Sequence, residues 1–487
     1  MLEVGWLLGL GGLFTLIMYN ICLHPLASYP GPKACAATRI PYFWALLTGN
    51  LVGQVSEWHR EYGPVVRIAP DELSYASADA WHDIYGNRQN HAQVSKDPRF
   101  YSAPLSNTPV DKIADKADET RYRHSLAQAF AKFSIRHQEP LVKGYVDMLI
   151  MRLYQQIEMG SSSIDMVKWY TFTTFDIIRD LAFGESFGCL ENSQYHGWIS
   201  MVLGKIRFGV YLNVIKRIPG GQLLLRFLSA EMFGLFQPKH KLLTPEQIDQ
   251  SLNNGQDKIT FLSQLLRLND PSRQMTATEV MANSSAFILA GSETTATALC
   301  GITYCLLSEP AAMKKLVEEV RGAFNSEDEI TISSSSKLKY MMAVINEGLR
   351  MYPAVPIGLP RVVEGKGIVI DGAWVPGGTT VAVSQVSANR SPLNFAHPDR
   401  FIPERFLDDP EFASDKRDAL QPFLTGPRNC LGKALAYAEM RLILARIFWN
   451  FDMKLHPDVV DWSDQRTYFL WEKKPLKVQL VPASMEE

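Results

Sequence analysis

The sequence lacks an excess of basic residues. It has 49 Lys and Arg against 51 Asp and Glu, which gives a formal net charge of -2 at pH 7. Binding to a phosphate backbone needs a basic excess or a basic stripe. The composition therefore argues against nucleic acid as a main partner, while a hydrophobic content of 46% over 487 residues is ordinary for a protein with a large core.

The sequence also lacks paired cysteines. Its six cysteines show no Cys-x-x-Cys spacing and no Cys/His cluster at the spacing of a zinc site. This pattern indicates reduced thiols in a reducing compartment, most of them simple core residues. Cys430 is the exception, because its sequence setting suggests more than a core thiol.

A nucleotide-binding glycine motif is missing as well. The nearest pattern, Gly-Leu-Gly-Gly at residues 9–12, lies inside an apolar run and has no strand–turn–helix setting. Nor does the sequence contain an internal repeat, or a Pro/Gly-rich linker that would divide the globule. One large domain is therefore expected rather than two.

Helical periodicity dominates what is present. Helices are expected over residues 121–133, 140–158, 172–183, 278–307, 309–324, 336–352 and 433–451, and strands over 65–76, 367–383 and 476–482. The middle strand region is expected to form a hairpin with Asp371-Gly372 at its turn. The expected fold class is mainly α with small β-sheets.

An uncharged apolar run occupies residues 4–23. As a helix at about 1.5 Å per residue it would span about 30 Å, the thickness of a bilayer core. A cleaved signal peptide would need a basic start and a shorter apolar core, whereas the only early charge is Glu3. We therefore expect an uncleaved membrane anchor over residues 1–24, a stiff Pro-rich hinge over 25–40 and a globule over 41–487. The basic residues after the run place the globule on the cytosolic side.

The segment from Phe423 to Gly432, FLTGPRNCLG, presents Cys430 directly before a helical pattern. A helix N-terminus lowers the pKa of a thiol, because its free N–H groups favour the thiolate. Gly426 and Gly432 let the chain turn around the sulfur and lie against a flat group, and Arg428 is suited to a carboxylate beside it. Such a thiolate fits the fifth ligand of haem iron. A reactive or structural cysteine in a surface loop is the alternative.

This spacing resembles the haem-ligand loop of the cytochrome P450 monooxygenases. Their pattern is Phe, two free positions, and then Gly, Arg, Cys and Gly at every second place. Leu424 stands where many members carry glycine. The resemblance implies a cytochrome P450 fold with haem b as cofactor, Cys430 as the axial ligand of the iron and Arg428 on a haem propionate. It also implies that Phe423 and Gly432 lie at the haem.

Glu347 and Arg350 are three residues apart on an expected helix and so share one of its faces. Alone, such a pair is a weak signal, because exposed ion pairs are common and contribute little. Arg405, in the segment Pro403–Phe406, offers a third member. In the resembled family a Glu–Arg–Arg cluster of this kind locks the core beside the cysteine loop, so we assign these three residues a structural role.

Residues 287–298, FILAGSETTATA, place small side chains along one stripe of an expected helix. Ala290 and Gly291 would leave room for a flat cofactor and dioxygen, although tight packing on a neighbouring helix gives the same pattern. Glu293 and Thr294 form an acid–alcohol pair that can pass protons inward and hydrogen-bond dioxygen. The stretch matches the oxygen-activation helix of the family, which implies catalytic roles for both residues.

Further cations are expected on the haem propionates. Arg361 follows a chain path that in the family returns over the haem, and Arg123 resembles a propionate-binding arginine of an early helix. Substrate contacts are expected from the segments 100–107, 199–211, 355–359 and 469–470, and in particular from Phe287, Ala290, Val355, Ile357 and Phe469. These positions are largely apolar, so a lipophilic small molecule is the expected substrate.

The resemblance covers essentially the whole chain and is greatest to filamentous-fungal microsomal members. It implies a monooxygenase that uses O2 and electrons from NADPH, delivered by a separate NADPH–cytochrome P450 reductase, with cytochrome b5 as a further candidate donor. It also implies a single-pass protein of the endoplasmic reticulum membrane, with a role in secondary-metabolite biosynthesis. The same site could catalyse desaturation, epoxidation or oxidative rearrangement instead, and a non-catalytic haem protein is the alternative of a different class.

Overall fold

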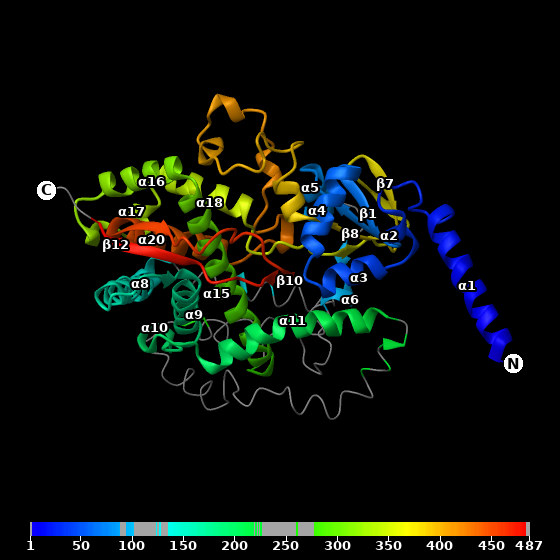
Figure 1. The fold of residues 1–487 in the computed structure, drawn as a ribbon, viewed down its shortest axis with the longest axis horizontal. Helices are drawn as coiled ribbons and strands as arrows, with labels where there is room; N and C mark the ends of the chain where they lie inside the picture. The colour runs from blue at the N-terminus through cyan, green and yellow to red at the C-terminus, as the bar shows by residue number, and fades with distance from the viewer. Residues whose placement is uncertain are drawn as a thin grey trace.

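The computed structural model describes residues 2–87, 94–101, 123, 126–127, 135–218, 220–221, 223, 225, 260–261 and 277–483. Helices make up most of this part of the chain, and small sheets lie at one side and along one edge (Figure 1). The N-terminal helix α1 (Leu2–Cys22) projects from the globule, and the C-terminus lies at the opposite end (Figure 1). The expected fold class, mainly α with small β-sheets, is confirmed.

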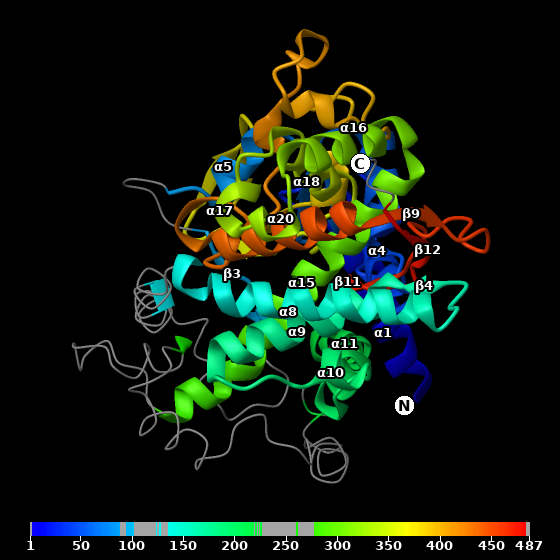
Figure 2. The same ribbon diagram turned by 90° about the vertical axis from the view of Figure 1, so that its left-hand side faces the viewer.

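The helical core is built around α15 (Ala277–Ser308). This helix packs against α9 (Met166–Phe183), α18 (Lys339–Met351) and α20 (Lys433–Asn450). Figure 2 shows α20 and α8 (Ile135–Glu158) running side by side across this core. The long apolar runs predicted for these helices are therefore buried against one another, and the predicted boundaries of α15 and α20 agree with the observed ones within one residue.

Sequence signals explain where α9 begins and ends. The side chain of Asp165 accepts a hydrogen bond from the N–H of Val167 at 3.1 Å, which caps the first turn. Gly184 follows the last residue with a φ of 86°, the left-handed conformation that commonly closes a helix. Most of the apolar side chains between these two ends are buried, and those of Phe175 and Ile177 are fully buried.

The remaining helices are short or lie at the surface. They are α2 (Lys33–Ala37), α3 (Ile40–Leu47), α4 (Leu51–Tyr62), α5 (Asp79–Tyr85), α6 (Pro98–Tyr101), α10 (Cys189–Asn192), α11 (Gly197–Arg217), α16 (Pro310–Ala323), α17 (Ile332–Ser335) and α19 (Gln385–Asn389). The 3₁₀ turns in the part of the chain that the structure describes are η2 (Glu327–Glu329), η3 (Pro403–Phe406), η4 (Pro410–Phe412), η5 (Arg417–Ala419) and η6 (Gly426–Arg428). The predicted helix over 121–133 lies largely outside the described residues.

The main sheet joins segments from the two ends of the chain. Its order is β1 (Val65–Ala69), β2 (Glu72–Tyr75), β8 (Thr380–Val383), β5 (Arg361–Val362) and β3 (Ser95–Lys96). A second sheet joins β4 (Ile164–Asp165), β12 (Lys477–Pro482) and β9 (Phe451–Leu455), and β10 (Thr467–Tyr468) pairs with β11 (Leu470–Trp471). Pairing between strands that are distant in sequence thus joins β1 and β2 to the segments that follow α18.

The predicted hairpin over residues 367–383 is only partly correct. β6 (Gly367–Ile370) and β7 (Ala373–Pro376) form it, with Asp371 at φ 51° and Gly372 at φ 76° in the turn. β8, which the prediction included, leaves the hairpin and pairs with β2 and β5 of the main sheet. Local turn chemistry specified the hairpin. The pairing of β8 depends instead on β5 and β2, which lie about 20 and about 300 residues earlier in the chain.

Residues 25–40, the expected Pro-rich hinge, pack onto the globule. Leu26 and Cys35 are buried, and the Tyr29 hydroxyl donates to the carbonyl of Trp374 on β7 at 2.9 Å. The connection to α1 is therefore held by packing as well as by proline stiffness, and it is not a free linker.

Two helices bear on membrane insertion. α1 has 21 residues, and its apolar part within the described side chains is Gly11–Cys22. Among the described residues, α11 is long and apolar enough to cross a membrane by length and composition. It contacts α3, α6 and β10, however, so it lies against the globule. α1 projects from the body instead, as an anchor would (Figure 1).

Candidate active site

Cys430 lies between η6 and the first turn of α20. Its N–H donates to the carbonyl of Phe423 at 2.8 Å, which closes the loop around the sulfur. The N–H groups of Gly432 and Lys433 donate to the sulfur. The residue is accessible from one side, so the loop presents a sulfur surrounded by donors to whatever binds there. These are the helix-start donors that the sequence predicted.

The predicted lowering of the Cys430 pKa was wrong in its net direction. Burial of the sulfur by the loop raises the pKa of the thiol. The N–H groups of Gly432 and Lys433, together with the charges of Arg123 and Lys433, lower the pKa but do not outweigh the burial. Because a thiolate is the form that ligates a metal, binding of iron by this sulfur must release a proton.

The backbone conformation of the cysteine loop explains why residue 426 is glycine and how Leu424 fits a position where many family members carry glycine. Gly426 has a φ of +75°, and a Cβ built there would lie 2.1 Å from the carbonyl oxygen of Tyr85, so only glycine fits. Leu424 also takes a positive φ, 59°, which costs a residue with a side chain about 1–2 kcal/mol. The chain thus keeps the left-handed turn that glycine favours, although leucine occupies the position.

Tyr85, at the end of α5, is a site residue that the sequence analysis missed. Its hydroxyl donates to the carbonyl of Leu359 at 2.8 Å and accepts from the N–H of Val383 at 3.2 Å. Its ring lies 5.5 Å from the guanidinium of Arg361, and its carbonyl meets Gly426. Tyr85 therefore joins the cysteine loop to the main sheet. An aromatic residue at the end of a short helix gives no sequence signal for such a role.

Arg361 is the clearest candidate for an anion-binding residue. It is 3% exposed, and its Nη1 has no hydrogen-bond partner in the described part of the chain. A buried guanidinium donor without a partner costs free energy, and a carboxylate is the group that satisfies it best. Arg361 lies on β5, whose neighbour is β3. Arg428 donates to the carbonyl of Val94, directly before β3, at 3.3 Å. Both arginines therefore lie near the β3–β5 edge of the sheet.

Arg123 is also brought to the cysteine loop. Its Nη2 donates to the carbonyl and to the side-chain oxygen of Asn429, at 2.6 and 2.8 Å. Asn429 is the residue before Cys430, so this arginine both holds the loop and places a positive charge beside the sulfur. A sulfur with backbone donors and an unpartnered buried guanidinium nearby is a donor set that fits a haem with its propionates.

The predicted ion-pair cluster is present and fully buried. Glu347, Arg350 and Arg405 have side chains with 0% exposure. Glu347 accepts from Nε and Nη2 of Arg350 at 2.7 and 2.8 Å, from Nε of Arg405 at 3.1 Å, and from the N–H of Ile402 at 2.7 Å. The cluster therefore joins α18 to η3 at a site closed to water.

Asp415 completes this cluster and was not predicted. It pairs with Nη1 of Arg405, and its other oxygen accepts from the N–H of Ala396 at 2.7 Å. Arg350 donates to three main-chain carbonyls besides its carboxylate partner, which are those of Asn389, Pro398 and Arg400. Two positive and two negative charges are thus balanced, and the arginines fix the long connection between α19 and η6.

On α15 the structure separates the two readings of the small-residue stripe. A Cβ at Gly291 would lie 2.7 Å from the side chain of Ile178 on α9, so helix packing accounts for this glycine, and it does not leave open space for a cofactor. Ala290 is exposed. The Thr294 hydroxyl donates to the carbonyl of Ala290 at 2.6 Å, so these two residues share one face of the helix.

Glu293 faces a different neighbour. It is 3% exposed, and its Oε1 accepts from Nζ of Lys473, which also donates to the Thr297 hydroxyl at 2.7 Å. Its Oε2 has no hydrogen-bond partner in the part of the chain that the structure describes. The sequence analysis missed Lys473, since a lysine in the dipeptide before Pro475 resembles an ordinary surface residue.

Some of the predicted substrate segments contact one another or the residues beside them. The ring of Phe469 stacks on that of Phe100 with centroids 5.8 Å apart, and Arg207 on α11 lies 5.0 Å from the ring of Tyr468. Phe287 packs edge-on against Phe261 at 5.9 Å. The predicted segments beginning at 100 and 469 are thus in direct contact, and the segment beginning at 199 contacts Tyr468, the residue before the last of them. Residues 102–107 lie outside the described part.

The segment after α18 joins the same region. Trp471 donates its indole N–H to the carbonyl of Pro353 at 2.8 Å and stacks on Tyr352 at 4.4 Å. Ile357 is buried and Val355 is half-buried. The part of Val355 and Ile357 in substrate binding stays a prediction.

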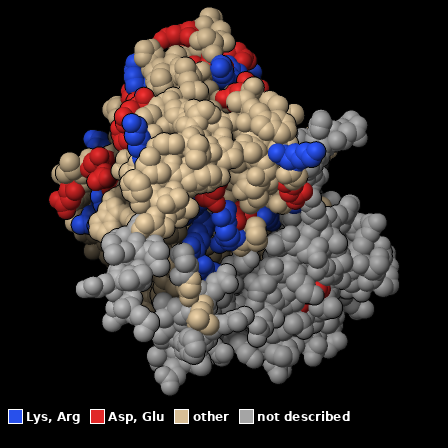
Figure 3. All heavy atoms as spheres, turned by 90° about the vertical axis from the view of Figure 1, so that its right-hand side faces the viewer, with Lys and Arg blue, Asp and Glu red and all other residues tan. Residues whose placement is uncertain are grey.

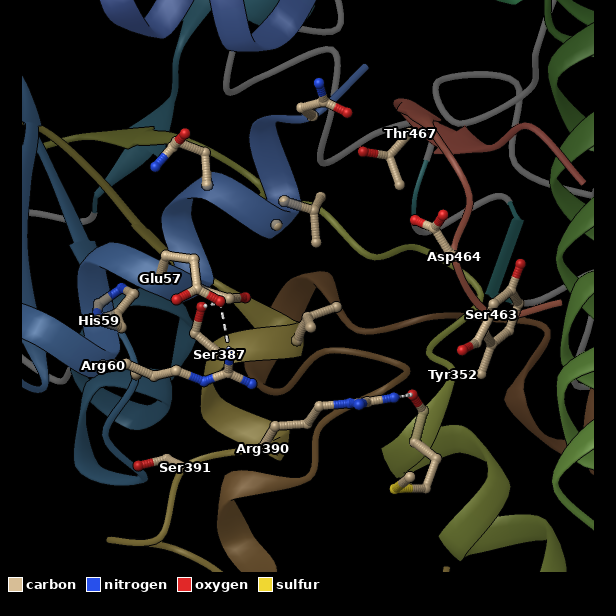
Figure 4. A pocket seen from close by; sticks show the side chains of 18 of the residues that line it. Glu57, His59, Arg60, Tyr352, Ser387, Arg390, Ser391, Ser463, Asp464 and Thr467 are labelled. Atoms are coloured by element: carbon tan, nitrogen blue, oxygen red, sulfur yellow. Dashed lines mark hydrogen bonds and ion pairs between the residues drawn. The ribbon is translucent and has the colours of Figure 1, made fainter. Parts of the chain in front are cut away.

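A cavity lies apart from the cysteine loop. It is a cleft of about 730 Å³ between α4, α19 and residues 461–471. Figure 4 shows Arg60 paired with Glu57 on one wall and Arg390 reaching across it, where its Nη2 donates to the carbonyl of Met351 at 3.0 Å. None of its lining residues comes from the cysteine loop or from α15, so this cleft is not part of the candidate active site.

Comparison with known proteins gives the family context. Residues 36–480 match the family model described as cytochrome P450. The chain is 43% identical to cytochrome P450 monooxygenase atr2 of Stereocaulon alpinum, with 95% of this chain and 92% of that protein covered. It is 42% identical to averantin hydroxylase of Dothistroma septosporum (98% and 92%) and to cytochrome P450 monooxygenase astA of Talaromyces wortmannii (96% and 94%).

Proposed function

This chain belongs to the cytochrome P450 family, and from that premise we propose that Cys430, Arg361 and the acid–alcohol pair of α15 form its catalytic centre. The chain is a haem-dependent monooxygenase related to enzymes of fungal secondary metabolism. When bound, the haem supplies activation of dioxygen at its iron. The protein supplies binding, orientation and protons, and these are the roles assigned here.

The cysteine loop is the observation that carries the proposal. Cys430 is the residue that would ligate the haem iron, because its sulfur receives two backbone N–H donors and is exposed. Arg361, with its unpartnered buried Nη1, is the proposed binding residue for one propionate. Arg428 and Arg123 are the proposed cations for the rest of the propionate charge, and both also tie the loop in place.

The proposed role of Thr294 is to orient dioxygen, and that of Glu293 is to pass protons to it. Both lie near the middle of α15, one residue apart, so they point about 100° from each other around the helix axis. Their side chains therefore face two different regions, the candidate substrate side and the C-terminal segment. We propose that the proton passes from Glu293 to the Thr294 side through water. Phe423 and Gly432 are proposed neighbours of the haem as parts of the same loop.

We propose that electrons come from NADPH through a separate reductase. The sequence has no dinucleotide-binding motif of its own, and the family uses redox partners. The proposed substrate is a lipophilic small molecule bound near Phe100, Phe287 and Phe469. Phe100 stacks on Phe469, and Phe287 packs against Phe261. The relatives are enzymes named for fungal metabolites, which supports a secondary metabolite as the substrate.

We propose further that residues 1–24 anchor the chain in the endoplasmic reticulum membrane, with the catalytic domain over residues 41–487 in the cytosol. Ile40 and Trp44 on α3 are each 70% exposed, and Trp374 on β7 is 57% exposed. These elements lie on the side of the globule from which α1 projects (Figure 1). On that side a broad uncharged area borders a group of Lys and Arg side chains (Figure 3). Apolar and aromatic side chains beside basic ones suit a membrane interface.

The proposal is tested by a reduced carbon-monoxide difference spectrum. The purified chain is expected to give the absorption band characteristic of thiolate-ligated haem, and the Cys430→Ser variant is expected to lose it. Cys22→Ser is the matched control, since Cys22 is also an exposed free thiol, and it should keep the band. A Cys430→Ser protein with an unchanged spectrum would remove the ligand assignment.

A second experiment identifies the reaction. The chain is expressed with a reductase in a fungal host that makes candidate precursors, and the products are compared by mass spectrometry. Addition of one oxygen atom indicates hydroxylation or epoxidation, and loss of two hydrogens indicates desaturation. Haem binding without any NADPH-dependent product or peroxide would favour a non-catalytic haem protein.

A further inference from the structure

The contact between Glu293 and Lys473 joins α15 to the segment that follows β11. Both side chains are nearly closed to water, with 4% exposure for Glu293 and 6% for Lys473. The ammonium group of Lys473 donates one hydrogen bond to the Glu293 carboxylate and another to the Thr297 hydroxyl, one helical turn further along. A lysine buried to this degree from a C-terminal loop has lost its hydration, which is favourable only with a partner charge.

The other titratable groups around this pair add no cation to it. They are Cys300 on α15, Tyr195 before α11, Tyr352 after α18 and Asp165 before α9, and each interacts electrostatically with Glu293 or with a group beside it. Burial raises the pKa of the Cys300 thiol and of both tyrosine hydroxyls, so these three groups stay neutral. Burial also raises the pKa of Asp165, whose carboxylate accepts main-chain N–H bonds.

In the described part of the chain, Lys473 is thus the cation in contact with Glu293. A buried carboxylate with no cation favours its protonated form, because burial penalises the charge. A protonated carboxyl cannot accept a further proton. An ammonium fixed on Oε1 keeps the carboxylate ionised and leaves the unpartnered Oε2 free to accept one.

We propose that Lys473 is the positioning residue that keeps Glu293 ionised and oriented for proton transfer, and that the proton path of this enzyme enters between α15 and the segment after β11. In each transfer, a hydronium ion relayed from solvent gives a proton to Oε2 of Glu293 and becomes water, and the carboxyl passes that proton through water to the Thr294 side. Glu293 returns to the carboxylate, and Lys473 remains an ammonium throughout. The inference rests on the proposed monooxygenase function.

Four single variants test the proposal, three on the segment after β11 and one on α15. Lys473→Met removes the charge and keeps much of the volume, Lys473→Arg keeps the charge, and Glu293→Gln removes the acid. Lys474→Met is the control, because Lys474 is the exposed neighbour and donates only to the carbonyl of Asp464. Before any of them is assayed, the unaltered holoprotein must show the thiolate-type spectrum and oxidise NADPH with reductase. If it does not, the proposed function has failed, and the role of Lys473 is not what failed.

The first measurement needs no turnover. Thermal unfolding midpoints of the holoproteins are compared from about pH 6 to 9. For Lys473→Met the midpoint is expected to fall more steeply with rising pH than in the unaltered protein, because the folded state then holds a proton on Glu293 that the unfolded chain releases. The double variant Lys473→Met/Glu293→Gln, which lacks this carboxyl, is expected to return to the slope of the unaltered protein. An excess slope that persists in the double variant would contradict the proposal.

The second measurement reports proton delivery without a known substrate. Oxidation of NADPH by O2 to hydrogen peroxide consumes one proton for each NADPH (NADPH + H⁺ + O2 gives NADP⁺ + H2O2). With Lys473→Met the rate is expected to fall about tenfold or more at low pH and to recover as pH rises by two to three units, which are order-of-magnitude expectations from general acid–base catalysis and from burial of a carboxyl. Glu293→Gln should be slow at every pH, and Lys473→Arg and Lys474→Met should remain within about threefold of the unaltered rate.

The two roles of the pair give different results. If the role of Lys473 is only to hold the segment after β11 against α15, the Lys473→Met variant loses rate equally at every pH. The double variant is then slower than Glu293→Gln by the same factor. That outcome, or an unchanged rate in Lys473→Met, would overturn the proposal. If Lys473→Met does not fold, the double variant and Lys473→Arg still test it, since the proposal requires the double variant to match Glu293→Gln and Lys473→Arg to restore the pH profile.

Discussion

Replacing Glu347 with Gln is expected to cost about 3–5 kcal/mol of folding free energy, the range for breaking a buried ion pair on one side. The side chain accepts four hydrogen bonds, three of them from the guanidinium groups of Arg350 and Arg405. An amide of the same shape turns a donor toward these donors and removes one of the two negative charges. The two arginines then share only Asp415, and a net positive charge stays in a site with no exposure.

Urea unfolding of the holoprotein, followed by tryptophan fluorescence, measures this loss as a shift of the midpoint at constant slope. Since whole-domain stabilities lie at about 5–15 kcal/mol, the variant should retain little haem at 37 °C. Glu318→Gln is the matched control, because Lys314 and Glu318 form an exposed i,i+4 pair at 3.7 Å on α16, for which about 0.3–0.5 kcal/mol is expected. Equal losses in the two variants would refute the reasoning, because burial would then have made no difference.

Three further predictions follow from single features. Gly426→Ala should abolish the thiolate-type spectrum, since its Cβ would lie 2.1 Å from the Tyr85 carbonyl, whereas Gly432→Ala should keep it, since its Cβ meets only the Cys430 sulfur at 3.9 Å. Burial raises the pKa of Glu439 from 4.5 to about 8, so the folded state keeps a proton that the unfolded chain releases. Stability should therefore fall by about 1.4 kcal/mol per pH unit between these values, and thermal unfolding of Glu439→Gln should lack this loss; equal slopes in both proteins would exclude it. Removal of residues 1–24 should release the chain from microsomes in a sedimentation assay, and complete retention would show that another surface binds the membrane.

The elements that could be predicted from sequence were those with strong local signals. The long apolar periods of α15 and α20 and the Asp-Gly turn of the β6–β7 hairpin depend on residues close in sequence, and their bounds or turn agreed with the structure. The cysteine loop and the Glu347 cluster were predictable because their spacing is specific. Local chemistry could not reveal the route of β8 into the main sheet, because its partners are far away in the chain.

The residues that were missed share one property. Tyr85, Asp415 and Lys473 each acquire their role from a partner at least 10, and in two cases more than 170, positions away in the chain. Each of them looks ordinary in its own stretch of sequence. Gly291 illustrates the opposite error, since a small residue that suggested space for a cofactor is explained by close packing on Ile178. Three-dimensional packing decides between such readings, and periodicity alone does not.

The close approach of Gly426 to Tyr85 has a consequence for biosynthesis. A ribosome adds about 5–20 residues per second, so Tyr85 emerges on the order of 20–70 s before the glycine that must dock on it. During that interval the N-terminal strands lack β5 and β8 as well, because these also come from the later part of the chain. The pocket for the prosthetic group therefore cannot close until translation is nearly finished, and a chain stalled before residue 426 should emerge colourless and dependent on chaperones.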